Sequence, residues 1–411
     1  MKAPAAQWTD RFGHVHEEMS AEVPAHEGSI PRVATPQHLP AGTSNPIVTE
    51  CGDPLLRDFT WIVEAPDAHA VLLWANGMFN HEEVESSEFE RVDGSDLWAL
   101  TLRLPSSWRA SYRIAVWDSP EPAPWRQKGD RFAIRTSALE AAALDPRAGE
   151  IIGGSHGPSC LAAGPDAPVE IWRTLRWPAA PESAALGTVH EHEFAAGKRY
   201  GEQRVWVYEP QHADATALLV LFDGQVWHEQ LHLSEILDAA IAGGMLPPLH
   251  VAMVDSHDVT TRWQELGVPG GQVDFVLDTL LAHLRDRYDI RAHRDSTVVS
   301  GQSLGGIAAI WALALGGDQI GHAIAQSPSL WRFDMSRALR RNDDWLSLHL
   351  QAGRFEGDML THAAALRDEL TNTAQPTGRT ITLDAIDGGH DWAWWRAGLV
   401  HKLGVVLAAD H

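Results

Sequence analysis

A serine flanked by glycines is the residue of this sequence best suited to nucleophilic chemistry. It lies in the pentapeptide Gly-Gln-Ser-Leu-Gly at 301–305, between a β-branched segment at 296–300 and an alanine- and leucine-rich segment at 307–314. A strand, a sharp turn and a helix are the setting in which G-x-S-x-G presents a nucleophile, and the helix N-terminus favours developing negative charge. We therefore predict that Ser303 is a catalytic serine. The alternative is an ordinary glycine-rich turn between a strand and a helix.

A general base for this serine is available near the end of the chain. His390 follows two glycines and an alternating apolar run at 380–386, and it precedes a segment of helical composition at 392–408. In α/β-hydrolases the nucleophile, the acid and the histidine follow one another in this order. Of the 22 histidines we therefore select His390 as the base that takes the proton of Ser303 and returns it to the leaving group.

The acid that orients this histidine should follow the strand predicted at 345–351 and precede His390. Two carboxylates fit that place, Glu356 and Asp358. Glu356 is our choice and Asp358 the alternative, since either carboxylate would orient an imidazole and stabilise imidazolium. Asp391 is nearest to His390 in the chain, but an aspartate at the start of a helix is more typical of a cap.

The oxyanion formed in the reaction requires two donors. The first is the backbone N–H of Leu304, directly after the serine. The second should follow an early central strand, and the continuous apolar run at 217–222 is typical of one. We assign this donor to the backbone N–H of Gln225. Asp223, which precedes the nucleophile in the chain, is better suited to organising the loop.

The motif-bearing segments together resemble the enterochelin esterase (ferric enterobactin esterase) family, which belongs to the esterase-D-like branch of the α/β-hydrolases. The resemblance covers 186–411, where the matching segments are 221–227, 260–266, 299–306, 326–331 and 387–391. It extends upstream through the segments 91–98, 108–112 and 145–146. It implies cytoplasmic hydrolysis of the ester bonds in the serine trilactone of a catecholate siderophore similar to enterobactin or bacillibactin. Iron would enter only as cargo of the ferric substrate, and the reaction would require no cofactor or catalytic metal.

Two positions depart from the family pattern. Leu304 stands where an aromatic residue is common after the nucleophile, and Gly-Val-Pro-Gly-Gly at 267–271 replaces an asparagine-bearing segment. These differences leave the chemistry intact and leave the particular siderophore open.

The charge of the chain bears on this substrate. A ferric tris-catecholate is anionic, whereas the chain has 32 Lys and Arg against 55 Asp and Glu, a formal net charge of −23. The site must then be locally basic, and four arginines fall in or beside the motif segments: Arg262, Arg332, Arg354 and Arg396. The substrate contacts that we predict are Arg262, Glu265, Trp227 and Trp331, the indole rings being suited to stacking on a catechol amide. The clustered Trp392, Trp394 and Trp395 are assigned to packing of the last helix.

The acidic balance excludes classes of function that need a basic surface, nucleic-acid binding and anionic-membrane binding among them. No run of 18 apolar residues exists, and the first ten residues lack the apolar stretch of a secretory signal. Cys51 and Cys160 make no disulfide framework and fit no metal spacing. We expect a cytoplasmic enzyme with reduced thiols, and the oligomeric state stays open.

The elements that must position these residues divide into two domains. Short β-like segments at 58–63, 70–74, 97–104 and 111–116 predict an all-β sandwich of immunoglobulin-like type. Further along, apolar strands alternate with helical patterns, which predicts an α/β-hydrolase whose mostly parallel sheet carries helices on both faces. The predicted order is a flexible arm at 1–45, the sandwich at 46–163, a proline-rich linker at 164–185 and the hydrolase at 186–411.

These observations predict a serine esterase that works through an acyl-enzyme. Two alternatives stay open: a feruloyl or acetyl esterase acting on carbohydrate-linked esters, whose fold is similar, and a non-catalytic ligand binder on a hydrolase scaffold. The missing signal segment disfavours the first, and the complete set of serine, acid and histidine disfavours the second. The sandwich could wall the pocket, as the resemblance favours, bind glycan, or serve as a packing module.

Overall fold

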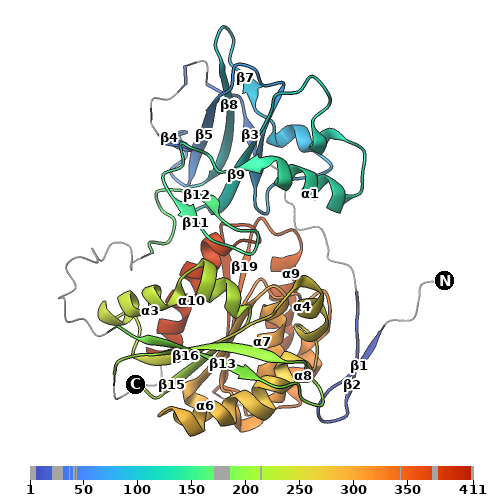
Figure 1. Ribbon diagram of the computed structural model, residues 1–411, viewed down its shortest axis with the longest axis vertical. Coiled ribbons are helices and arrows are strands. Elements are labelled where there is room, and N and C mark those ends of the chain that lie inside the picture. The colour runs from blue at the N-terminus through green and yellow to red at the C-terminus, as the bar shows by residue number, and fades with distance from the viewer. Residues whose placement is uncertain are drawn as a thin grey trace.

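The computed structural model describes residues 6–408 apart from 21–30, 171–185, 213–214, 343, 373–377 and the single positions 37, 40, 41 and 43. Figure 1 shows two bodies, a β-rich one that precedes an α/β one in the chain. Most of the predicted linker, 171–185, lies outside the described residues, as do 1–5 and 21–30 of the predicted N-terminal arm.

Two antiparallel sheets form the N-terminal domain. One has the strand order β3-β8-β5-β4 with β7 beside β8, and the other has the order β10-β9-β12-β11 with β6 beside β9. The strands are β3 (Arg32–Val33), β4 (Ile47–Glu50), β5 (Leu56–Glu64), β6 (Ala70–Ala75), β7 (Glu90–Arg91), β8 (Leu97–Pro105), β9 (Arg109–Trp117), β10 (Ala142–Ala143), β11 (Ile151–Ile152) and β12 (Ser159–Ala163). The four segments with β-like alternation correspond to β5, β6, β8 and β9.

An aromatic core lies inside this domain. Trp61, Trp108 and Tyr112 are fully buried, and the ring of Trp61 meets the other two rings edge to face at centroid distances of 6.4 Å and 5.8 Å. Aromatic rings bury a large apolar area each and prefer such edge contacts. One helix, α1 (Arg131–Ala141), contacts β6 and β9 after the short 3₁₀ turns η1 (Val84–Ser87) and η2 (Pro124–Arg126). No helix was predicted at α1 from the sequence.

An eight-stranded sheet runs through the second domain in the order β13-β14-β16-β15-β17-β18-β19-β20. β13, β14 and β16 pair antiparallel, and every other pair is parallel. The strands are β13 (Thr188–Phe194), β14 (Gln203–Glu209), β15 (Ala217–Leu221), β16 (Leu249–Val254), β17 (Thr297–Gln302), β18 (His322–Gln326), β19 (Ser347–Gly353) and β20 (Thr380–Ile386). This is the α/β-hydrolase fold, as predicted.

Helices cover both faces of the sheet (Figure 1). They are α3 (Leu233–Ala242), α4 (Val259–Glu265), α5 (Gln272–Phe275), α6 (Leu281–Arg287), α7 (Leu304–Leu315), α8 (Met335–Arg340), α9 (Met359–Asn372) and α10 (Trp392–Ala408), with π-helical turns η3 (Val226–Gln230) and η4 (Val276–Leu280) and 3₁₀ turns η5 (Arg294–Ser296) and η6 (Gly317–Gln319). None of the helices in the described part of the chain is long and apolar enough to cross a membrane.

Alternation along the central strand explains the two layers of helices. Leu218 and Val220 of β15 pack into the core that includes α5, α6 and α7, while Leu219 and Leu221 pack into the core that includes α3 and α10. Successive side chains of a strand point to opposite faces, so a continuous apolar run requires cover on both sides. The sheet therefore holds the carboxyl ends of its parallel strands at one edge, where the catalytic candidates lie.

The prediction of a flexible arm at 1–45 is wrong for residues 6–20. There β1 (Gln7–Thr9) and β2 (Val15–Glu17) form a hairpin that packs on the hydrolase domain. Glu18 accepts a hydrogen bond from the buried Arg332 at 2.7 Å, and the ring of His16 meets that of Trp311 at 4.7 Å. The sequence of the hairpin has no clear periodicity, and the residues that it packs against lie some three hundred residues away in the chain, so local patterns did not predict it.

Candidate active site

Ser303 sits in a strained turn between β17 and α7. Its backbone has φ 59° and ψ −116°, a conformation that costs on the order of 1–3 kcal/mol for a residue with a side chain. The turn also needs glycine around it, because a Cβ on Gly301 would lie 2.3 Å from the carbonyl oxygen of Gly305. The turn is held by the N–H of Ser303, which donates to the carbonyl of Gln326 at 3.0 Å. This is the geometry of a nucleophile elbow.

A carboxylate and an imidazole meet beside this turn. Nδ1 of His390 lies 3.1 Å from Oε2 of Glu356, whose side chain is fully buried. Oε1 of Glu356 accepts hydrogen bonds from the hydroxyl of Ser327 at 2.7 Å and from the N–H of Gly353 at 2.8 Å. The alternative acid, Asp358, is exposed. Of the two carboxylates, the structure brings Glu356 to the histidine.

Burial dominates the electrostatics of this pair. It lowers the pKa of His390 to about 3, and the positive charges of Arg262 and Arg135 act in the same direction. Burial raises the pKa of Glu356, and the hydrogen bonds from Ser327 and Gly353 oppose this rise because they favour the carboxylate. A histidine with a lowered pKa is neutral at physiological pH, as a general base must be.

This shift predicts the acid limb of the pH–rate profile. The base is active when neutral, so a pKa below its ordinary value of about 6.5 keeps it active as the pH falls through that value. We expect kcat/KM, measured on an ester from about pH 3 to about pH 8, to keep its plateau as the pH falls through about 6.5 and to decline only toward the acid end of this range. Arg135→Gln should move this limb to higher pH, because it removes a positive neighbour of His390, whereas Arg135→Lys should not. A limb that stays in place in the glutamine variant would contradict this.

The His390 ring also has an aromatic neighbour. The ring of Trp395 meets it edge to face at 4.7 Å, and the indole N–H of Trp395 donates to the hydroxyl of Ser327 at 2.9 Å. Ser327 thereby links Trp395 to Glu356. Trp395 was assigned to packing of the last helix, but it also fixes the imidazole and lines the cavity described next.

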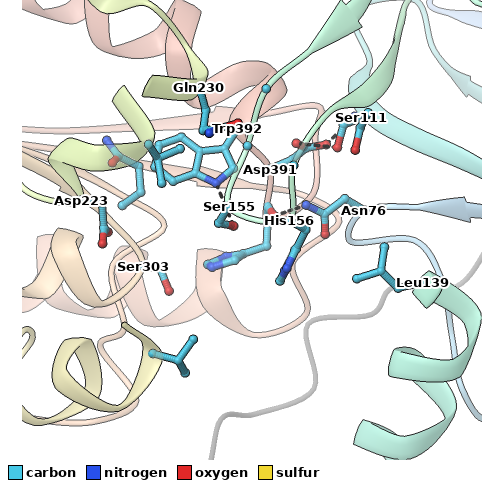
Figure 2. Close-up of a pocket in the computed structure, with 18 of the residues that line it drawn as sticks. Asn76, Ser111, Leu139, Ser155, His156, Asp223, Gln230, Ser303, Asp391 and Trp392 are labelled. Carbon is cyan, nitrogen blue, oxygen red and sulfur yellow. Dashed lines mark hydrogen bonds between the residues drawn. The ribbon is translucent and has the colours of Figure 1, made fainter. Parts of the chain in front are cut away.

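Ser303 and His390 open into one cavity of about 840 Å³, which both domains line. Figure 2 shows Ser303 and Asp223 of the hydrolase domain on one side and Asn76 and Leu139 of the sandwich on the other. The volume lies at the upper end of the range of small-molecule sites, about 300–1,000 Å³. The cavity therefore has room for a bulky ester.

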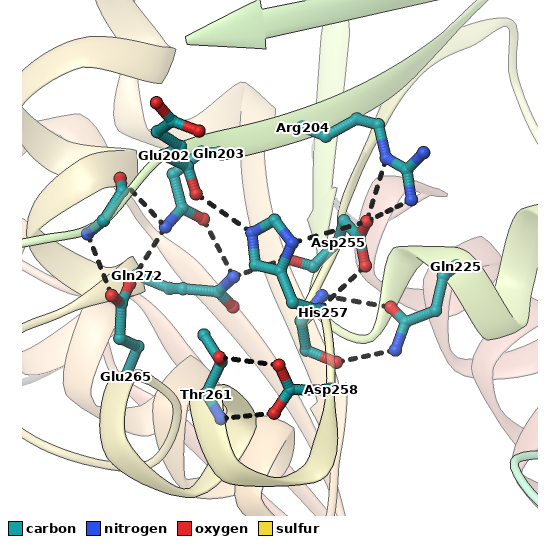
Figure 3. A network of polar contacts seen from close by, with 12 residues as sticks. Glu202, Gln203, Arg204, Gln225, Asp255, His257, Asp258, Thr261, Glu265 and Gln272 are labelled. Atoms are coloured by element: carbon teal, nitrogen blue, oxygen red, sulfur yellow. Dashed lines mark hydrogen bonds and ion pairs between the residues drawn. The ribbon is translucent and has the colours of Figure 1, made fainter. Parts of the chain in front are cut away.

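The two predicted oxyanion donors stay predictions, with a setting that fits them. Leu304 is the first residue of α7, directly after the serine. Gln225 lines the cavity, and its side-chain amide exchanges hydrogen bonds with Ser256 at 2.7 Å and 3.0 Å, which holds the turn after β15 (Figure 3). Asp223 accepts hydrogen bonds from Ser256 and Arg262 in the same turn.

Three of the predicted substrate contacts, Trp227, Trp331 and Glu265, lie outside the residues that line the cavity. Trp227 is fully buried and donates to the side chain of Gln302 at 3.1 Å. Trp331 is 7% exposed and stacks on Trp263. Glu265 accepts from the N–H of Gly201 and the amide of Gln203, both at 2.9 Å (Figure 3). Nearness to a motif in sequence does not determine which way a side chain points.

Of the four arginines considered for a basic patch, one lines the cavity and three do not. Arg262 lines the cavity and forms a two-pronged ion pair with Asp223 at 2.7 Å and 2.8 Å. The other three pair elsewhere: Arg332 with Glu18, Arg354 with Asp387 and Arg396 with Glu170. The cavity instead receives Arg131 and Arg135 from α1 and His156 from the loop after β11. Arg131 and Arg135 were not predicted as site residues. Their only signal in the sequence is a spacing of four residues, and two arginines at that spacing are common on exposed helices.

Comparisons with known proteins agree with this arrangement. The family described as "Enterochelin esterase, N-terminal" matches residues 57–173, and the family described as "Putative esterase" matches residues 200–405. The iron(III) enterobactin esterase of Dickeya dadantii is 28% identical over 370 residues, which are 82% of each chain. The iron(III) salmochelin esterase of Escherichia coli is 27% identical over 373 residues, 85% of this chain and 86% of that protein.

Solved structures show the same fold over both domains. The enterobactin esterase from Shigella flexneri, crystallised in the presence of enterobactin, matches with a TM-score of 0.72 at 23% identity and covers 89% of this chain and 97% of its own. The ferric enterobactin esterase from Salmonella typhimurium matches with a TM-score of 0.72 and the same coverage. The two-domain arrangement is therefore shared with these proteins.

Proposed function

The chain belongs to the enterochelin esterase family of carboxylic ester hydrolases, and from that premise we propose that it hydrolyses the ester bonds of a catecholate siderophore trilactone through an acyl-enzyme on Ser303. One observation carries this proposal. The serine of a nucleophile elbow and a histidine paired to a buried glutamate open into the same large cavity. Relatives over four-fifths of the chain bear the names of iron(III) siderophore esterases.

Each residue of the site has a separate role in the proposed reaction. Oγ of Ser303 attacks the ester carbonyl while Nε2 of His390 takes its proton, and the N–H groups of Leu304 and Gln225 hold the oxyanion. The imidazolium, stabilised by Glu356, gives that proton to the serine oxygen of the substrate as its bond to the carbonyl carbon breaks, so that this oxygen leaves as a hydroxyl. Water then attacks the carbonyl of the acyl-enzyme while His390 takes its proton. His390 returns this proton to Oγ of Ser303, which releases the carboxylic acid and restores the enzyme.

The anionic charge of the substrate has a counterpart in the cavity. Arg131 and Arg135 of α1 lie one helical turn apart, so they point the same way, and both line the cavity that also contains Ser303. The exposed ring of Phe132 lies between them in sequence and also lines the cavity. Paired guanidinium groups beside an aromatic ring suit a catecholate, which offers charged oxygens and a flat face.

The experiment that tests the function is incubation of the purified chain with a catecholate trilactone, ferric and iron-free, followed by mass analysis of the products. We expect stepwise opening of the lactone to linear trimer, dimer and monomer, since each ester bond is of the same kind. Feruloylated and acetylated sugars serve as the competing substrates. Cleavage of those sugars alone would overturn the proposal.

The arginines of α1 provide a second arm of this experiment. Arg131→Gln should raise KM for the ferric trilactone by about 5- to 20-fold with little change in kcat, because it removes a charged contact to the bound substrate. The effect on an uncharged aryl ester should be absent. Arg337→Gln is the matched control, since Arg337 lies on α8 and outside the lining of the cavity.

A further inference from the structure

The short segment that carries His390, between β20 and α10, is bonded to the N-terminal domain. The N–H of Arg109 donates to the carbonyl of Asp387 at 3.1 Å, and the side-chain amide of Asn76 donates to the carbonyl of His390 itself at 2.9 Å. Both donors belong to the sandwich. The backbone of the catalytic histidine is therefore held by a different domain from the one that supplies Ser303.

The residue after the histidine strengthens this connection. Asp391 is fully buried, and the N–H and the hydroxyl of Ser111 donate to its two carboxylate oxygens at 2.5 Å and 3.0 Å (Figure 2). The N–H of Ala393 donates to the same carboxylate at 3.0 Å, where α10 begins. A buried carboxylate requires such donors, and hydrogen bonds to a charged group are stronger than neutral ones. Asp391 thus joins the catalytic segment to β9 as well as capping α10.

Steric contact adds to the hydrogen bonds. Gly77, the residue after Asn76, has φ +77°, and a Cβ there would lie 2.6 Å from Cα of Gly389 and 2.9 Å from the nitrogen of His390. A Cβ on Gly389 would in turn lie 2.7 Å from the carbonyl oxygen of Asn76. The two backbones touch with no room for a methyl group. This explains the glycine before the histidine by packing rather than by the turn alone.

The two side-chain donors stand on one rigid support. Asn76 directly follows β6 and Ser111 lies on β9, which are paired strands of one sheet. The N–H of Asn76 donates to the carbonyl of Ser111 at 3.0 Å, so the two residues are fixed relative to each other. Groups held on packed strands place a reacting side chain more accurately than groups on a free loop.

We propose that Asn76 and Ser111 are positioning residues for catalysis, through which the N-terminal domain sets the place of His390 relative to Ser303. From the hydrolase side, Glu356 and Trp395 fix the orientation of the ring, at 3.1 Å and 4.7 Å. From the sandwich side, the hydrogen bonds fix the backbone from which that ring projects. The role assigned here rests on the proposed function of Ser303 and His390, and it goes beyond a wall around the substrate.

Asn76→Asp is the sharpest test, because it keeps the shape of the side chain and removes the N–H donor. The carboxylate then faces the carbonyl of His390, and the segment must move away. We expect kcat to fall by about 10- to 100-fold, a loss typical of a displacement of about 1 Å at a catalytic group, with KM for a small uncharged aryl ester nearly unchanged. Ser111→Ala should lower kcat less, since its N–H still reaches Asp391.

Two readouts separate positioning from binding and from the identity of the substrate. The first is kcat and KM on both the trilactone and a small aryl ester, since a displaced base slows both reactions alike. The second is the rate at which a fluorophosphonate labels Ser303. There the serine oxygen bonds to phosphorus, fluoride leaves, and His390 takes the proton, so the rate reports the base directly. It should fall by the same factor of about 10 to 100 in Asn76→Asp.

Matched controls are Asn80→Asp and Ser119→Ala, in the same domain. Asn80 and Ser119 accept hydrogen bonds from N–H groups two residues on and lie outside the cavity lining, so both variants should retain the parent rates.

Melting temperatures show whether Asn76→Asp is folded, and Asn76→Ala is the second variant if it is not. A raised KM with unchanged kcat, or labelling at the parent rate, would overturn the positioning role. A parent that resists the reagent and cleaves neither ester would overturn the catalytic assignment and this role with it.

Discussion

Replacing Ser303 with alanine is expected to reduce kcat for ester hydrolysis by a factor on the order of 10⁵ to 10⁶, because a nucleophile and its base act as a unit. Binding of the substrate should stay within about threefold of the parent, since the lining of the cavity is otherwise unchanged. The measurements are product formation by mass analysis and binding by quenching of the tryptophan fluorescence. The residual rate should exceed that in water, because the oxyanion donors remain.

The control for this variant is Ser300→Ala, three residues earlier, on β17. The hydroxyl of Ser300 is buried and donates to the carbonyl of Ile324 at 2.8 Å, away from the cavity lining. Its loss should cost about 1 kcal/mol of stability and leave kcat within a few-fold of the parent. An alanine variant at 303 that retains full activity would remove Ser303 from the mechanism and return the pentapeptide to an ordinary turn.

Local patterns in the sequence were enough to locate the elements that carry the triad candidates. The segment 392–408 was expected as the last helix and is α10, and the alternating run at 380–386 is β20. These predictions are confirmed because a half-buried strand or helix shows a regular spacing of apolar residues over consecutive positions of the sequence. The order of nucleophile, acid and histidine then limits the choice of histidine to a late one, which is how His390 was selected among 22.

Contacts between distant segments were beyond the reach of the same patterns. Trp227 and Trp395 both lie beside motifs, yet Trp227 is buried behind the turn while Trp395 lines the cavity, and nothing in their neighbouring residues distinguishes them. Arg131 and Arg135 enter the cavity only because α1 packs on the sandwich at the domain boundary. Which residues line the cavity therefore depends on how the two domains pack against each other.

The segment around His390 depends both on a local sequence pattern and on a contact with a distant segment. The paired glycines before His390 were visible in the sequence and helped to select this histidine, but the backbone that packs against them was not. The structure places the backbone of Gly77, in the turn after β6 and more than three hundred residues earlier, against Gly389. A local signal therefore selected His390 as the candidate base, and a non-local contact explains why the residue before it is a glycine.

The last prediction concerns the acid. Glu356→Gln should lower kcat by a factor of about 10⁴. Oε1 of the glutamine can keep the hydrogen bonds from Ser327 and Gly353, so its NH₂ then faces Nδ1 of His390. An amide donor at that place forces Nδ1 to accept, which puts the ring proton on Nε2, where the proton of Ser303 must arrive. The imidazole is then in the wrong tautomer to act as a base, and its charged form has lost the carboxylate that stabilises it.

Asp358→Asn is the matched control for this variant. It makes the same chemical change two residues away, on an exposed carboxylate, and should leave kcat within about twofold of the parent because solvent screens the lost charge. A melting temperature near that of the parent would show that Glu356→Gln acts on the chemistry and not on folding. Loss of activity in Asp358→Asn with retention in Glu356→Gln would reverse the assignment, and it would mean that the loop after β19 rearranges to bring the exposed carboxylate to the histidine.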